Sequence, residues 1–113
     1  MKIDIEEAVT ESRAAAIREL EAVLITAPNH DAAVVELVGP YRRTGRSRSA
    51  LPRIVALIRR DVYHFSALIC LGEILIDLAR ESDALKAFER VLRFDPNHSE
   101  ALRYHRLLLR GRM

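Results

Sequence analysis

Arginine is the residue type whose clustering in this sequence most directly suggests a chemistry. Arg42, Arg43, Arg46 and Arg48 lie close together, and the block from Leu37 to Arg60 holds seven arginines and no acidic residue. Guanidinium groups bind phosphate and carboxylate oxygens in a planar, two-pronged geometry. This basic patch is therefore a candidate site for nucleic acid or another polyanion, for an acidic protein, or for the acidic blocks of the chain itself. Only Tyr41 lies beside it to stack on a base.

Histidine and cysteine offer the other candidate chemistry. His30, His64 and His98 recur at intervals of 34 residues, and Cys70 is the one cysteine. Histidines on neighbouring repeats would be held about 10 Å apart, the diameter of a helix, which is too far for ligands of one zinc ion. A thiol on an apolar helix face is typical of packing. The sequence also contains no glycine-rich phosphate loop and no nucleophile elbow, so we expect no metal site, no cofactor and no enzymatic activity.

The histidine interval belongs to a repeat that runs through the chain. Residues that share a place in this repeat, called a column here, are 34 residues apart, and five apolar columns recur three times: Ala16, Ala50, Ala84; Ile17, Leu51, Leu85; Leu20, Ile54, Phe88; Val23, Leu57, Val91; Leu24, Ile58, Leu92. Within one repeat the five columns fall at i, i+1, i+4, i+7 and i+8, as in Ala84, Leu85, Phe88, Val91 and Leu92. This spacing is one face of an amphipathic helix. Such a helix needs a partner, so the spacing predicts stacked helix pairs.

One stretch resembles a known family. Leu68-x2-Leu71-Gly72-x2-Leu75, then Ala84-x3-Phe88, then Pro96, is similar to the tetratricopeptide repeat (TPR) pattern W-x2-L-G-x2-Y, A-x3-F, P, with leucine in place of both aromatic residues. The preceding repeat departs from the pattern at Val38, in the glycine column, and at Val62, in the proline column. Because Gly72 has no side chain, we expect two helix backbones to approach closely there, opposite the small Ala84.

The predicted fold is an all-α, antiparallel helix-pair (TPR-like) solenoid of about three repeats, forming a single domain over residues 1–113. It divides into a partial repeat (1–30), two repeats (31–64 and 65–98) and a C-terminal capping helix (99–113). We expect helices at about 4–26, 30–43, 49–60, 64–79, 83–94 and 98–110. The first helix is either continuous or broken near residues 10–12, and Pro40 is expected to kink or shorten the second. Helix N-caps are predicted at Asn29, Ser49, Ser82 and Asn97.

The resemblance implies a non-catalytic scaffold that binds a peptide segment or partner protein in a concave groove, lined by the first helix of each pair. Transferring the groove columns places there Ala32, Val35, Gly39, Arg42 and Arg43, then Ser66, Ile69, Glu73, Ile76 and Asp77, then Arg103, Leu107 and Arg110. An apolar strip with two acids in the middle and arginines at both ends suits a peptide with charged flanks. Family members that clamp a C-terminal carboxylate use lysine and asparagine where this sequence has Val35, Glu36 and Gly39, so that clamp is not expected.

The two ends of the chain differ in charge. The net charge of +2 conceals a block of −5 over residues 1–36, from eight acids and three bases, and a block of +4 over residues 101–113. Solenoid ends need a polar outer face, yet Leu107, Leu108 and Leu109 follow one another near the C-terminus. They predict either a homodimer through the C-terminal helix or a longer array.

Composition bounds the remaining classes. A hydrophobic content of 50% with a small net charge excludes a disordered chain, and no apolar run approaches the roughly 20 residues that a membrane span needs. Acidic residues stand where a signal peptide would be apolar, so we expect a cytoplasmic protein without a membrane partner. We predict a protein-interaction scaffold whose partner is an unidentified protein or peptide. The alternatives are an arginine-patch binder of nucleic acid or another polyanion, and a self-associating assembly element.

Overall fold

The computed structural model describes residues 4–111, and these form six helices and no strand. Residues 1–3 and 112–113, at the outer ends of the predicted partial repeat and capping helix, lie outside the described residues. The helices are α1 (Ile5–Thr26), α2 (Asp31–Arg43), α3 (Ser47–Arg60), α4 (Phe65–Asp77), α5 (Glu81–Phe94) and α6 (Ser99–Arg110). All six predicted helices are confirmed, each with ends within two residues of those expected.

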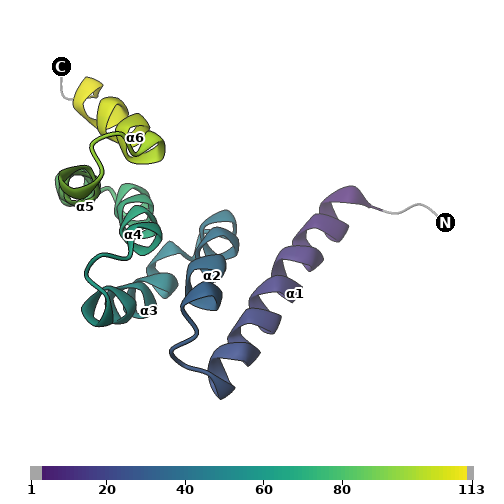
Figure 1. The fold of residues 1–113 in the computed structure, drawn as a ribbon. Coiled ribbons are helices and arrows are strands. Elements are labelled where there is room, and N and C mark those ends of the chain that lie inside the picture. Colours follow the sequence, from purple (N-terminus) through teal and green to yellow (C-terminus); the bar gives the residue numbers. More distant parts are fainter. Residues whose placement is uncertain (1–3, 112–113) are drawn as a thin grey trace.

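The helices stack in chain order into an elongated array (Figure 1). Each helix packs against the next, and α2 also packs against α4, so the first helices of neighbouring pairs are in contact. Two groups of buried side chains, one spanning α1 to α4 and one spanning α4 to α6, meet through Ile58 and Leu71. The core therefore runs continuously along the array, as a helix-pair solenoid requires.

The prediction that Gly72 allows a close contact between α4 and α5 is confirmed, but the group opposite Gly72 is the Phe88 ring and not Ala84. A Cβ atom on Gly72 would lie 2.3–2.8 Å from the Phe88 ring, which is far closer than van der Waals contact permits. Phe88 is fully buried, and its ring stacks on Tyr104 with centroids 4.7 Å apart. The missing side chain at Gly72 thus makes the space in which α5 packs against α4.

The predicted N-caps were wrong, and the histidine column explains why. His30, His64 and His98 immediately precede α2, α4 and α6, and the imidazole Nδ1 of each accepts a hydrogen bond from the backbone N–H three residues later, at 3.1–3.2 Å. These bonds satisfy donors that would otherwise be unpaired at a helix start. Asn29 and Asn97 lie one residue too early for this role. Arg46 and Arg80 precede α3 and α5, in place of the expected Ser49 and Ser82, without a side-chain cap.

Two open questions about helix continuity are settled. Helix α1 is continuous through residues 10–12, and α2 continues past Pro40 to Arg43. Pro40 does not shorten α2, which ends at Arg43 as the predicted range 30–43 has it, and the kink at Pro40 stays a prediction. The turn after α2 contains Gly45 at φ +71°, and the equivalent position after α4 is Ala79 at φ +60°. The two equivalent turns therefore share a left-handed backbone conformation at the same position of the repeat.

Candidate binding surface on helices α2, α4 and α6

Arg42 links two neighbouring first helices. From the last turn of α2, its Nη1 lies 2.9 Å from Glu73 Oε2 and its Nε lies 2.8 Å from Asp77 Oδ2, both on α4. Its Nη2 also donates to Asp77 Oδ1 at 3.3 Å, so the guanidinium binds the Asp77 carboxylate in a bidentate manner. The two acids predicted in the middle of the groove are therefore paired inside the chain.

Two hydroxyl groups extend this polar network to other helices. Tyr104 on α6 donates to Glu73 Oε2 at 2.6 Å, and Ser47 at the start of α3 donates to Asp77 Oδ2 at 2.6 Å. Ser47 is buried although it is polar. The network thus joins α2, α3, α4 and α6, and it fixes the spacing of the three first helices.

The network shifts the acid–base behaviour of its members. The hydrogen bond from Arg42 is the largest cause of a lowered pKa at Asp77, and the same bond raises the pKa of Arg42 further above neutrality. Burial, followed by the bond to Glu73, raises the pKa of Tyr104. Arg42 and Asp77 are therefore held in their ionised forms, and the Tyr104 hydroxyl keeps its proton at neutral pH.

The remaining groove residues differ in accessibility. Val35 and Ile76 are half-buried, Leu107 is 55% exposed, and Arg103 lies over the Tyr104 ring at 5.0 Å. Ile69, by contrast, is 4% exposed and belongs to the core between α4 and α6. The structure therefore brings Arg42, Glu73 and Asp77 together and places Ile69 out of reach of a partner.

The basic patch separates into arginines with different surroundings. Arg42 is ion-paired as described, and the Arg46 guanidinium lies 4.8 Å from the centre of the Tyr41 ring. Tyr41 is 4% exposed, and its hydroxyl donates to Glu21 at 2.5 Å. Burial and this bond raise the pKa of Tyr41. Because Tyr41 is enclosed, it cannot serve as a stacking platform for a base.

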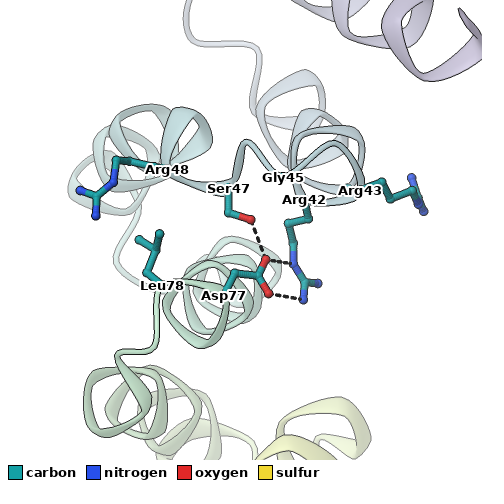
Figure 2. Close-up of a pocket in the computed structure, with 8 residues that line it drawn as sticks. Arg42, Arg43, Gly45, Ser47, Arg48, Asp77 and Leu78 are labelled. Atoms are coloured by element: carbon teal, nitrogen blue, oxygen red, sulfur yellow. Dashed lines mark hydrogen bonds and ion pairs between the residues drawn. The ribbon is translucent and has the colours of Figure 1, made fainter. Parts of the chain in front are cut away.

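Arg43 and Arg48 flank a hollow of about 700 Å³ where α2, α3 and α4 meet (Figure 2). Its lining also includes Gly39, Gly45, Ser47 and Leu78, together with the paired Arg42 and Asp77. Both Arg43 and Arg48 are exposed, and neither forms an ion pair with any residue between 4 and 111. Asp77, the one carboxylate in the lining, already accepts bonds from Arg42 and Ser47. Figure 2 shows the Arg43 and Arg48 side chains pointing outward on opposite sides, so the free charge at the rim of this hollow is positive.

Sequence reasoning identified these residues but not how they pair. Arg42 lies 31 residues before Glu73 and 35 before Asp77, close to one repeat of 34. Opposite charges one period apart on neighbouring first helices are the signal that could have found the link.

The other candidate groups, the histidine column and Cys70, have structural roles. The histidine column caps helices, and burial raises the pKa of the Cys70 thiol to about 12, which keeps it protonated and unreactive. Across residues 4–111 no three His, Cys, Asp or Glu side chains gather as metal ligands. None of the helices described is both long and apolar enough to cross a bilayer.

Comparison with known proteins gives structural neighbours only. No protein-family profile and no curated protein sequence matches the chain. The first TPR domain of Spaghetti (RPAP3), solved with the HSP90 peptide SRMEEVD, superposes with a TM-score of 0.80 at 19% identity, over 94% of this chain and 84% of that one. MamA superposes with a TM-score of 0.78 at 19% identity, over 98% of this chain and 66% of that one. A MamA mutant gives 0.67 at 22% identity, over 84% and 55%. The chain is therefore an all-α helix-pair array with the fold of tetratricopeptide-repeat proteins, as its 34-residue spacing predicts.

Proposed function

We propose that the chain is a non-catalytic scaffold that binds an acidic segment of a partner protein at the hollow between α2, α3 and α4. One observation carries this proposal: Arg43 and Arg48 flank the hollow without an ion-pair partner among residues 4–111, while Asp77 in its lining already accepts bonds from Arg42 and Ser47. A bound segment would supply the missing carboxylates. The division of residues 1–113 into a partial repeat, two repeats and a capping helix is part of the same proposal.

The size and lining of the hollow suit a peptide. Its volume of about 700 Å³ lies within the range of sites that hold small ligands or a few side chains. Leu78 contributes an apolar contact beside the arginines. Each exposed arginine–carboxylate pair contributes only about 0.2–1 kcal/mol, so the binding should be modest and weakened by salt.

A structural neighbour supports this kind of ligand. The RPAP3 domain holds a peptide, SRMEEVD, that contains three acidic residues. In the present chain the positions of the family's carboxylate clamp carry Val35, Glu36 and Gly39, which offer no cation. An acidic segment would therefore bind through Arg43 and Arg48, at the end of α2 and the start of α3, rather than through that clamp.

The nucleic-acid alternative has less support. Three arginines of the patch, Arg43, Arg46 and Arg48, pair with no carboxylate in the described range 4–111, but Tyr41 is enclosed beneath Arg46. A polyanion would meet charge without a stacking platform. We retain it as an outcome that the binding experiment distinguishes.

The experiment measures fluorescence anisotropy of labelled peptides of equal length, one rich in glutamate and leucine and one in which lysine replaces glutamate. Labelled single-stranded DNA is a third probe. We expect saturable binding of the acidic peptide alone. The Arg43→Glu/Arg48→Glu chain should lose roughly two- to thirtyfold in affinity, from two pairs at about 0.2–1 kcal/mol each. Arg59→Glu/Arg90→Glu, which changes the charge equally at exposed sites on α3 and α5, should bind as the unmodified chain does. Equal loss in both variants, or tighter binding of DNA, would contradict the proposal.

A further inference from the structure

Helix α1 corresponds to α3 and α5, the second helices of their pairs, but one of its sides is uncovered. Ala16, Leu20 and Val23 share columns with Ala84, Phe88 and Val91 of α5 and with Ala50, Ile54 and Leu57 of α3. All six residues of α3 and α5 are 0–2% exposed, whereas Ala16 and Leu20 are half-buried and Val23 is 38% exposed. In α5 these columns face the first helix of the same pair, as the contact of Phe88 with Gly72 shows. Among residues 4–111 no helix fills that place beside α1.

The uncovered side extends along the free half of α1. Ile5 is 74% exposed and Val9 is 38% exposed. With Ala16, Leu20 and Val23 they follow one another at intervals of four, seven, four and three residues, which places them in one stripe along the helix. Figure 1 shows this half of α1 standing apart from the other helices. We call the five residues the α1 stripe.

Helix α6 is uncovered on the complementary side. Leu102 and Leu109 share columns with Leu68 and Leu75, which lie 1% and 8% exposed beneath α5. Leu102 is half-buried, and Leu109 is 42% exposed. Leu108 points the other way, into the core, at 8%. The face that α4 presents to α5 is thus open on α6, within the described residues.

The two open faces also differ in charge. The exposed acids Glu6 and Glu19 border the α1 stripe on its two sides, and neither forms an ion pair within residues 4–111. On α6, Arg103, Arg106 and Arg110 are exposed, and none forms an ion pair within residues 4–111. Helix α1 is an acidic second helix without a first helix beside it, and α6 is a basic first helix without a second. The two open faces are therefore complementary in packing position and in charge.

We propose that copies of this chain associate head to tail, with α1 of one copy packing on α6 of the next and completing a helix pair between them. The contact joins two different surfaces, so it leaves one open face at each end and allows further copies to add. Arg106 stands in the column of Gly72, and Leu20 stands in the column of Phe88. The smaller Leu20 leaves room for the stem of Arg106, whose charged head can reach the acids of α1. The proposed contact adjoins the hollow at Arg43 and Arg48, because Arg43 also lines a second hollow with Ile5 and Val9 of the α1 stripe.

The experiment is sedimentation velocity of the chain from micromolar to millimolar concentration. We expect the weight-average mass to rise above 12.8 kDa as the concentration increases. Val23→Lys places a cation opposite the α6 arginines, and Leu109→Lys removes an apolar contact from α6. Both residues are exposed, so each variant should fold, and circular dichroism checks this. Each variant alone should remain a monomer.

An equimolar mixture of the two variants is the decisive arm. It contains an intact α6 on the first chain and an intact α1 on the second, so it should form a one-to-one dimer and nothing larger. The Arg59→Glu/Arg90→Glu chain, which is altered at exposed sites on α3 and α5, should associate as the unmodified chain does. A monomer at every concentration, or a Val23→Lys chain that still self-associates, as an α6-to-α6 dimer would, overturns the proposal.

Discussion

The packing of Gly72 against Phe88 predicts a large effect from a small substitution. In Gly72→Val the new Cβ would lie 2.3–2.8 Å from three ring atoms of Phe88, whereas ordinary contact begins near 3.4 Å. The ring cannot retreat, because it is fully buried and stacked on Tyr104. Overpacking of this kind costs about 1–3 kcal/mol, and the better helix propensity of valine returns only about 0.3 kcal/mol.

The preceding repeat supplies the compensating change. It has Val38 and Ile54 in the columns of Gly72 and Phe88, and both are at most 2% exposed. Gly72→Val should therefore lower the unfolding temperature by roughly 4–12 °C at about 4 °C per kcal/mol. Adding Phe88→Ile should recover part of this loss, with a favourable coupling of about 1 kcal/mol or more.

Thermal and urea unfolding followed by circular dichroism measures all four members of this cycle. A Gly72→Val chain as stable as the unmodified chain would refute the packing argument. A double variant whose loss equals the sum of the two single losses would refute the equivalence of the two repeats.

Three further predictions follow from single positions. Ala79 holds the left-handed conformation that Gly45 holds one repeat earlier, so Ala79→Gly should raise the free energy of unfolding by up to about 1 kcal/mol, measured in urea; a decrease would contradict this. The pKa of Asp77 is lowered on folding, so its contribution to stability is complete above the ordinary carboxyl value of 3.8 and is lost as the pH falls through the folded value. Asp77→Asn should therefore reduce the loss of stability between about pH 5 and about pH 2, compared with the control Glu89→Gln. Because Cys70 is buried with a pKa raised to about 12, a thiol reagent should modify it at mildly alkaline pH only after denaturant is added; rapid modification of the folded chain would contradict its packing.

The fold was predictable because the same apolar columns return every 34 residues. A helix that shows Ala84, Phe88 and Val91 on one face must bury that face, and the facing Leu68, Gly72 and Leu75 offer the matching surface. Helix pairing and close approach are consequences of side-chain size and period, which a single sequence displays directly.

The state of the charged residues was less predictable because it depends on rotamers and on contacts between repeats. The sequence placed Arg42, Glu73 and Asp77 in one groove, but whether they face a partner or one another is decided by distances near 3 Å. The burial of Ile69 and Leu108 depends likewise on how closely α4 and α6 approach. The histidine caps were missed because asparagine and serine, common N-cap residues, stood nearby.

The central claim, that Arg43 and Arg48 recognise an acidic segment, is tested most directly by selecting peptides from a random display library on the chain. The selected peptides are then screened against Arg43→Glu/Arg48→Glu and the control Arg59→Glu/Arg90→Glu. The account predicts peptides enriched in aspartate and glutamate that bind the unmodified and control chains and not the Arg43/Arg48 variant. Selected peptides without acidic enrichment, or with undiminished binding to that variant, would contradict it.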